Sequence, residues 1–157
     1  MKIPRIVIAA PRSGSGKTTV TISLMAALKN MVKNISAFKC GPDYIDPMFH
    51  KEILGIDSRN LDLFFTDRET TKDLFLKNNK SDISIVEGVM GLYDGMGGIS
   101  EEASTYDLAR TLKAPVVLVI DAKGMSRSIL AEAAGFISMD SDKLIKGIIL
   151  NNMSAGI

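Results

Sequence analysis

The sequence predicts an α/β fold in three layers, with a mainly parallel sheet between two layers of helices. Short runs of apolar and β-branched residues recur along the chain, and four of the five show no polar alternation, as parallel strands buried on both faces require. Helical patterns separate these runs, and such an alternation builds a parallel sheet through right-handed crossovers. The predicted strands are Ile3–Ala9, Ile35–Phe38, Ile83–Val86, Val116–Ile120 and Ile145–Leu150.

Four helices are predicted between the strands. The first begins near Lys17, and its apolar residues recur every four positions, which places them on one face. Two later helices begin at patterns that resemble capping boxes, Thr66-x-x-Glu69 and Ser104-x-x-Asp107. The apolar positions of the first helix are Val20, Leu24, Leu28 and Val32, and the later helices are predicted at about 67–78, 104–112 and 126–138.

The composition excludes several classes of protein. Nineteen basic and 18 acidic residues give a net charge of +1, which does not favour a nucleic-acid binder or a membrane-surface protein. No apolar run approaches the roughly 20 residues that cross a bilayer. A single cysteine allows no internal disulfide, which fits the reducing cytoplasm. The 157-residue chain ends at Ile157, just after the last predicted strand, so we expect one domain, 1–157, that is truncated.

A phosphate-binding loop is predicted between the first strand and the first helix. The segment APRSGSGKTT matches G-x-x-x-x-G-K-[ST] at Gly16, Lys17 and Thr18, and departs from it at Pro11. Backbone N–H groups at the start of a helix bind nucleotide phosphates, with the lysine near the β- and γ-phosphates and the threonine on Mg²⁺. The alternative is a coincidental turn. The pattern favours a P-loop NTPase-like fold whose nucleotide contacts are Ser13, Gly14, Ser15, Gly16, Lys17, Thr18 and Thr19.

Acidic residues follow the second and third predicted strands. Asp43 and Asp46 lie in a loop stiffened by prolines, although either could instead cap a helix near Pro47. Glu87 directly follows an apolar strand, where burying a carboxylate without a cation or donors is costly. Asp94 lies in a glycine-rich loop, either at the site or as a turn residue before Gly95. These positions are typical of groups that hold a metal ion or orient a substrate.

Other polar residues admit two interpretations each. Asn151 ends the last predicted strand, where its amide could read a nucleotide base or form a turn. Cys40 has no histidine nearby in sequence, so we expect a packed thiol, and we expect His50 on a helix surface. One histidine and one cysteine also exclude a zinc site. A loop that could bind an anion or be merely solvated contains Lys123, Ser126, Arg127 and Ser128.

Five segments resemble the cobyrinic acid a,c-diamide synthase family, and together they run through nearly the whole chain. Several members of that family share the proline found here at position 11. The two acidic segments are more specific than the phosphate loop. The five are APRSGSGKTT (10–19), KCGPDYIDPMFH (39–50), SRNLDLF (58–64), VEGVMGLYDG (86–95) and APVVLVIDAKGMSRS (114–128).

The resemblance implies a glutamine-dependent ligase of cobalamin biosynthesis that uses ATP and Mg²⁺. Such an enzyme amidates the a and c side-chain carboxylates of cobyrinic acid, a tetrapyrrole, through an acyl phosphate. Its N-terminal part resembles dethiobiotin synthetase, and a C-terminal glutaminase-like domain, absent from this chain, releases ammonia. A homodimer is possible. The implied metal ligands are Thr18, Asp46 and Glu87, and the implied catalytic residues are Lys17, Asp43, Asp46, Glu87 and Asp94.

Related functions remain open at this point. The same chemistry could act on hydrogenobyrinic acid or nickel-sirohydrochlorin, whose side chains differ little. A dethiobiotin-synthetase-like enzyme should lack the KCGPDYIDP segment. A ParA/MinD-like ATPase should have a lysine in place of Arg12 and a basic surface or an amphipathic membrane tail, which the sequence does not show.

Overall fold

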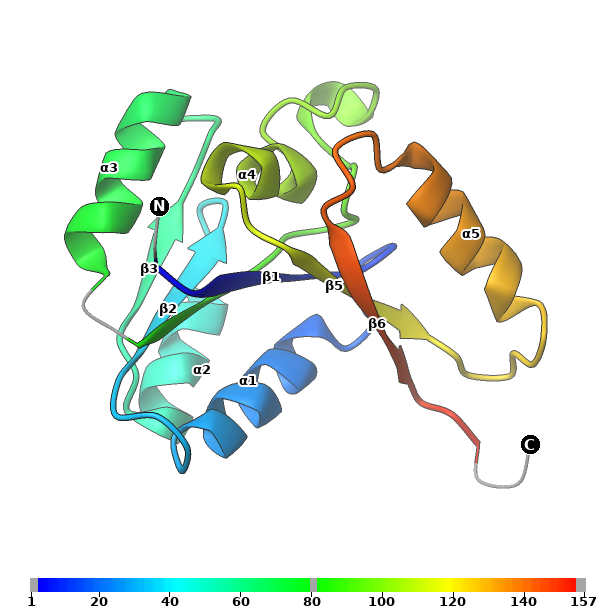
Figure 1. The fold of residues 1–157 in the computed structure, drawn as a ribbon, viewed down its shortest axis with the longest axis horizontal. Helices are drawn as coiled ribbons and strands as arrows, with labels where there is room; N and C mark the ends of the chain where they lie inside the picture. The colour runs from blue at the N-terminus through cyan, green and yellow to red at the C-terminus, as the bar shows by residue number, and fades with distance from the viewer. Residues whose placement is uncertain (1–2, 80–81, 155–157) are drawn as a thin grey trace.

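The computed structural model describes residues 3–79 and 82–154, and it has the predicted layered α/β fold (Figure 1). Within these residues six strands form one wholly parallel sheet in the order β3-β2-β4-β1-β5-β6. Ile157, where we expected a truncation, lies outside the described residues. The strands are β1 (Arg5–Ala9), β2 (Ile35–Cys40), β3 (Ser58–Leu61), β4 (Ile83–Glu87), β5 (Val116–Asp121) and β6 (Ile145–Asn151). The helices are α1 (Lys17–Leu28), α2 (Ile45–Leu54), α3 (Arg68–Asn78), α4 (Thr105–Leu112) and α5 (Ile129–Met139), with a 3₁₀-helix at Met96–Gly98.

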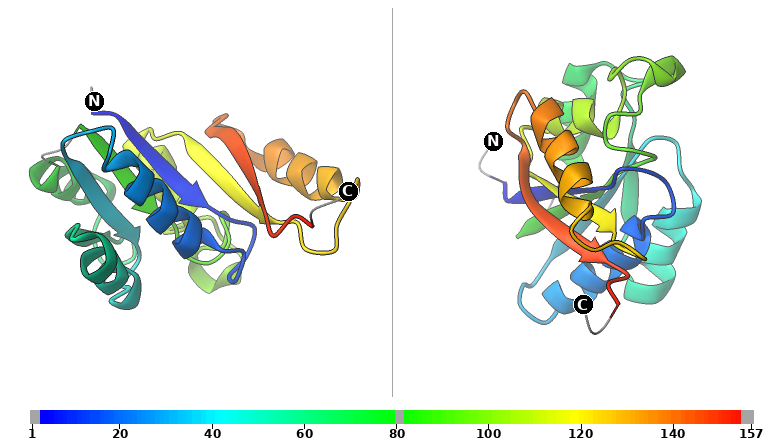
Figure 2. Two further views of the ribbon diagram at one scale, coloured as in Figure 1. Left: turned by 90° about the horizontal axis from the view of Figure 1, so that it is seen from below. Right: turned by 90° about the vertical axis from the view of Figure 1, so that its right-hand side faces the viewer.

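Helices cover both faces of the sheet. α1 and α2 lie on one face, and α3, α4 and α5 lie on the other (Figures 1 and 2). Successive side chains of a strand point to opposite faces, so the central strand β1 contributes to two apolar cores. Ile8 belongs to the core that includes Met25 of α1, whereas Val7 belongs to the core that includes Leu108 of α4. None of the described helices is long and apolar enough to cross a membrane.

The edge strand β3 is missing from the sequence prediction. Its four residues, SRNL, contain a single apolar side chain, Leu61, which is buried in one of the cores. β3 pairs only with β2, and its other edge is open. An edge strand exposes much of its surface, so it tolerates polar residues that a central strand would exclude. The apolar-run criterion therefore could not find it.

Several predicted helix ends are shifted. α1 ends at Leu28, so Val32 lies beyond the helix. α3 is capped by Asp67, whose side chain accepts from the N–H of Thr70 at 2.7 Å, and not by Thr66. The Thr66 hydroxyl donates instead to the carbonyl oxygen of Asp62. α5 begins three residues later than predicted, at Ile129.

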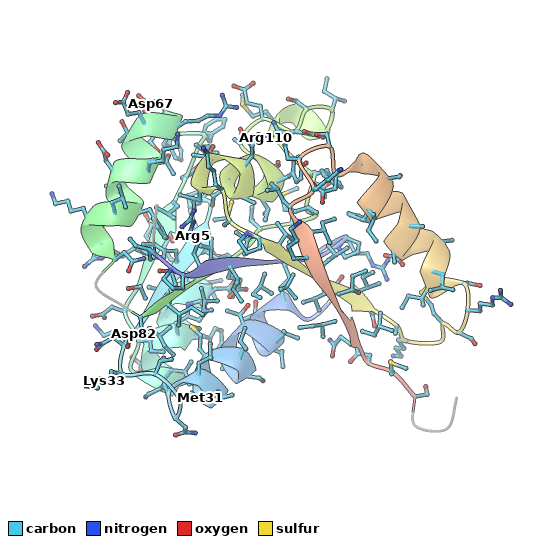
Figure 3. The ribbon with its side chains drawn as sticks, viewed as in Figure 1. Arg5, Met31, Lys33, Asp67, Asp82 and Arg110 are labelled. Carbon is cyan, nitrogen blue, oxygen red and sulfur yellow. The ribbon has the colours of Figure 1, made fainter. Side chains whose placement is uncertain are left out.

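The predicted cap of α4 is confirmed. The Ser104 hydroxyl oxygen accepts a hydrogen bond from the N–H of Asp107 at 3.1 Å, which satisfies a free donor of the first helical turn. At the other end of the helix, the Arg110 guanidinium donates to Asp142 and to Glu101 (Figure 3). α4 is therefore held at both ends.

Replacing Ser104 with alanine should lower the free energy of unfolding by about 1 kcal/mol, because the cap is lost while the helix remains buried. Urea unfolding followed by circular dichroism measures the change. Ser138→Ala is the matched control, since that hydroxyl only donates to Gly135 on an exposed turn of α5. Equal losses in the two variants would contradict the assignment of the cap.

Candidate functional site

The candidate site is a cleft of about 360 Å³ at the carboxyl edge of the sheet. β4 lies between β1 and β2, so the loops that follow these three strands open side by side. The phosphate loop follows β1, residues 41–44 follow β2, and residues 88–95 follow β4. The fold thus brings together three segments that the sequence separates by up to 70 or so positions.

The phosphate loop curves tightly into the start of α1. Gly14 and Gly16 have φ angles of 79° and 93°, which glycine adopts without strain. A Cβ on Gly16 would collide with the side-chain amide of Asn151. That amide donates to the carbonyl oxygen of Ser15 at 3.0 Å, and the Ser15 hydroxyl donates to the carbonyl oxygen of Arg12. The loop therefore presents its backbone at the positive end of a helix dipole, which favours phosphate.

The predicted nucleotide-binding residues divide into two groups. Most line the cleft, whereas Ser15 is buried behind it and Asn151 braces the loop from β6. The amide nitrogen of Asn151 is engaged with the phosphate loop. The predicted role of Asn151 in reading a nucleotide base stays a prediction. The lining residues of the loop and helix are Ser13, Gly14, Gly16, Lys17, Thr18 and Thr19.

Lys17 connects the phosphate loop to the loop after β4. Its ammonium donates to the carbonyl oxygen of Met90 at 2.7 Å and to that of Arg12 at 3.4 Å. Burial lowers the pKa of Lys17 below its usual value, and the nearby charge of Lys39 lowers it further, while Glu87 opposes both effects. A poorly solvated ammonium of this kind gains much from an anionic ligand.

Lys39 lies at the centre of a buried ionic network. Its ammonium is 2.5 Å from an oxygen of Asp46, 3.3 Å from one of Glu87 and 3.7 Å from one of Asp43. It also donates to the carbonyl oxygen of Gly88 at 3.0 Å. Burial lowers the pKa of Lys39, but attraction from Glu87 and Asp46 outweighs that effect and raises the pKa overall. The network joins β2, α2 and β4.

The oxygen atoms that could hold a magnesium ion lie close together beside this lysine. The Thr18 hydroxyl is 2.6 Å from Oε1 of Glu87 and 3.3 Å from Oδ1 of Asp46. Mg²⁺ prefers oxygen ligands and usually takes one or two carboxylates together with substrate phosphates, so these three residues fit it. The described residues contain no group of three or more His, Cys, Asp or Glu side chains that could hold a metal ion. A metal here would therefore depend on phosphate oxygens as well.

The prediction that His50 lies on a helix surface is wrong. The ring is completely buried on the inner side of α2, and Nε2 is 3.0 Å from Oε2 of Glu87. Glu87 is completely buried too. Burial raises the pKa of Glu87, but the hydrogen bond from His50, the charge of Lys39 and the hydrogen bond from Thr18 outweigh burial and hold the pKa below its usual value. The expectation that a buried Glu87 needs a cation and donors is met by these neighbours.

Asp43 makes the contacts of a helix cap and also faces Lys39. Its Oδ1 accepts from the N–H groups of Ile45 at 2.8 Å and Asp46 at 3.3 Å, which is the bonding of a helix cap. Its Oδ2 faces Lys39. Asp43 also lines the cleft, so a role toward substrate stays a prediction.

Asp94 makes the local contacts of a turn. Its Oδ2 accepts from the N–H of Gly91 at 3.0 Å, and its own N–H donates to the carbonyl oxygen of Gly91. A Cβ on Gly91 would collide with Asp94 and with the carbonyl oxygen of Pro11. The carboxylate is exposed and acts on Lys17 through its charge. Its catalytic role stays a prediction.

The loop after β5 is not part of the cleft. Asp121 accepts from the backbone N–H of Lys123 and from the side chain of Asn152, and it pairs with Arg12 at 3.9 Å. Arg12 also pairs with Glu132 of α5 at 3.8 Å. The residues that we considered as an anion site lie outside the cleft lining; they are Lys123, Ser126, Arg127 and Ser128.

Sequence reasoning missed two residues of the network. Lys39 is a charged residue next to the end of a mostly apolar strand, much as Glu87 is at the end of β4. The argument from the cost of burying a charge, applied to Glu87, could have found Lys39 too. His50 follows Asp46 by four residues on α2, so the two share one helix face.

Cys40 should behave as the packed thiol that the sequence predicts. It is 2% exposed, and burial raises its pKa from 9.0 to about 11. We expect a thiol reagent at pH 8 to modify the native protein at least about 100-fold more slowly than the urea-unfolded protein, because the thiolate is the reactive form. Since the unfolded thiol loses its proton first, stability should fall as the pH rises from about 9 toward 11. Equal reaction rates would contradict the burial of this thiol.

Lys39→Met should lower the free energy of unfolding by about 3 kcal/mol, because it leaves carboxylates buried without their cation. Millimolar Mg²⁺ should restore part of this loss, since a divalent ion can replace the missing charge. Urea unfolding with and without Mg²⁺ measures both effects.

Lys51→Met provides the matched control. Lys51 pairs with Asp57 at 2.9 Å, but both side chains are largely exposed, so little change is expected. An unaltered stability of Lys39→Met, or a Mg²⁺ effect equal to that on the control, would contradict the role of Lys39.

Comparison with known proteins finds close relatives in sequence. The chain is 51% identical over 98% of its length to hydrogenobyrinate a,c-diamide synthase of Streptomyces coelicolor. It is 50% identical over 97% to cobyrinate a,c-diamide synthase of Picrophilus torridus, and 49% identical over 96% to that of Clostridium acetobutylicum. These alignments cover 32%, 34% and 34% of the relatives, so the chain spans about a third of the length of the curated relatives it matches.

Structural comparison supports the fold class. The chain is similar to chloroplast FtsY from Physcomitrella patens with a TM-score of 0.61, over 96% of this chain and 50% of that one. At 14% identity this similarity concerns the fold alone. The sequence comparison is more specific, since the model of the CbiA family, described as the CobQ/CobB/MinD/ParA nucleotide binding domain, matches residues 6–156. With nearly every described residue inside that match, the chain belongs to the CbiA family of nucleotide-binding domains.

Proposed function

We propose that this domain carries the ATP and Mg²⁺ site of an enzyme that amidates the a and c side-chain carboxylates of cobyrinic acid. The observation that carries the proposal is a cleft beside the phosphate loop that is lined by Lys17, Lys39, Thr18 and the half-buried carboxylate of Asp46. The fully buried carboxylate of Glu87 contacts Thr18 and Lys39 from within the fold. The substrate class is inferred from the relatives, which are cobyrinate and hydrogenobyrinate a,c-diamide synthases.

The chemistry follows from the weakness of a carboxylate as an electrophile. A substrate carboxylate oxygen bonds to the γ-phosphorus of ATP as the bond to the bridging oxygen breaks, which gives an acyl phosphate and ADP. Ammonia then attacks the acyl carbon, loses a proton and expels phosphate, leaving the amide. The protein mainly positions these groups and neutralises charge.

The residues of the cleft divide these tasks among them. Lys17 and Lys39 place two ammonium groups where charge develops on the transferred phosphoryl group. Thr18, Asp46 and Glu87 would hold Mg²⁺, which would supply further charge neutralisation to the phosphates. Asp43, which lines the cleft, and Asp94, in the loop that follows β4, align the acceptor and the ammonia. No covalent nucleophile is needed, which agrees with the burial of Cys40.

The remaining parts of the reaction lie beyond this domain. Glutamine would supply ammonia through a glutaminase-like domain such as the family resemblance implies. Hydrogenobyrinic acid is an alternative acceptor, because the Streptomyces relative is named for it. Nickel-sirohydrochlorin is a second alternative, which rests on the family resemblance alone. A homodimer and a cytoplasmic location stay predictions.

A partitioning ATPase of the ParA/MinD type is the second candidate, because the family description includes those proteins. Arg12 occupies the position where such a switch should have a lysine, and it pairs with Asp121 and Glu132 of the same chain. This engagement within the chain favours the ligase.

A chimera tests the proposed function. Residues 1–157 would replace the matching third of the Picrophilus relative, and amide formation and ADP release would be measured with each macrocycle. We expect ATP-dependent amidation with glutamine and with ammonium chloride. A folded chimera that turns over none of the three macrocycles would overturn the proposal.

Lys17→Ala should lower the affinity of this chain for Mg·ATP at least about 30-fold, since truncating one partner of a desolvated charge pair costs about 2 kcal/mol or more. Isothermal calorimetry measures the affinity. Lys33→Ala, at the opposite edge of the sheet, is the control and should bind ATP as the unaltered chain does (Figure 3). Unchanged affinity in Lys17→Ala would refute the placement of ATP.

A further inference from the structure

We propose that His50 is a positioning residue that fixes the orientation of the Glu87 carboxylate toward the metal and phosphate site. The inference rests on the proposed function only in taking Glu87 as a group that acts on Mg²⁺. Its geometric part, the bond between His50 and Glu87, stands on the structure alone. Neither the sequence motifs nor the similarity to the relatives assigns a role to this histidine.

The two oxygens of Glu87 have separate partners. Oε2 is 3.0 Å from Nε2 of His50, whereas Oε1 is 2.6 Å from the Thr18 hydroxyl and 3.3 Å from the Lys39 ammonium. A carboxylate at the end of a glutamate side chain otherwise rotates over a broad range. Holding Oε2 at the histidine therefore keeps Oε1 directed at Thr18 and Lys39, both of which line the cleft.

The direction of the hydrogen bond follows from chemistry. An ionised carboxylate only accepts, so the shared hydrogen belongs to Nε2 of His50. Nδ1 is buried and has no hydrogen-bond partner among the described residues. The imidazole therefore makes its single side-chain hydrogen bond to Glu87, and nothing else in the described part of the chain competes for it.

Helix α2 positions His50 for its hydrogen bond to Glu87. Asp46 and His50 are four residues apart and so lie on the same face of the helix. Asp46 reaches Lys39 and Thr18, and His50 reaches Glu87 one turn further along. The helix thus supplies one group that lines the cleft and one that supports the cleft from behind.

The orientation matters because Mg²⁺ demands near-ideal octahedral geometry. Partners that orient a metal ligand typically change metal affinity 10- to 100-fold when removed. Without His50, the freed carboxylate can turn both oxygens toward the Lys39 ammonium, and Oε1 would then no longer be positioned to hold Mg²⁺. ATP bound without Mg²⁺ does not use this oxygen and should be insensitive to the change.

The first test needs no mutation. His50 is the only histidine in the chain, so its ring gives a single set of ¹⁵N resonances. We expect a slowly exchanging hydrogen on Nε2 in the native protein. A ring whose Nε2 carries no hydrogen, or whose Nε2 hydrogen exchanges as fast as that of free imidazole, would overturn the proposal.

The second test compares His50→Leu with His50→Gln, whose amide nitrogen can replace Nε2. Calorimetry measures ATP binding at a series of Mg²⁺ concentrations and again in EDTA. We expect His50→Leu to need 10- to 100-fold more Mg²⁺ for half-maximal binding, with little change in EDTA. His50→Gln should restore the Mg²⁺ requirement to within about threefold of the original.

The possible results are distinguishable. Equal losses in the two variants, or equal losses with and without Mg²⁺, indicate a merely structural histidine and overturn the proposal. If the unaltered chain binds no ATP at all, the proposed function fails, and the ¹⁵N result alone then decides whether His50 orients Glu87. Urea unfolding of each variant establishes the folded fraction used in the comparison.

Discussion

The structure of the site depends on one buried cation, the ammonium of Lys39. Asp43, Asp46 and Glu87 all lie within 4 Å of it, and Glu87 is completely buried. Carboxylates packed this closely repel one another, and burial without a counter-charge is costly. The charge of Lys39 offsets both the repulsion between the carboxylates and the cost of burying them. It thereby lets the loop after β2, helix α2 and strand β4 bring their acids to one point, where a metal and a triphosphate would add to the same balance of charge.

The sheet order makes this arrangement possible. The crossover from β1 to β2 skips the place that β4 later fills, so three loops of distant sequence converge at the middle of the sheet. Neighbouring parallel strands place Lys39 directly beside Glu87 in register. The phosphate loop enters from β1, on the other side of β4. The candidate cleft therefore lies where the strand order changes direction, as expected for ligand sites in open α/β sheets.

The sequence was sufficient for features that depend on local pattern. Strands buried on both faces, the phosphate loop and the Ser104 cap each have a signature within a few residues. β3 has none, because an edge strand is stabilised by pairing with β2 and not by its own apolar character. His50 was misjudged for a related reason: its partner Glu87 is 37 residues away, and only tertiary packing brings the two together.

The alternatives that the sequence left open for the acids are not exclusive, because a carboxylate has two oxygens. Asp43 caps α2 with one oxygen and faces Lys39 with the other. Asp46 divides its oxygens between Thr18 and Lys39. In each case one structural bond fixes the direction of the second oxygen, so the contacts that stabilise the fold also set the geometry of the cleft. A carboxylate that caps a helix beside a cleft can therefore still act on a ligand through its second oxygen.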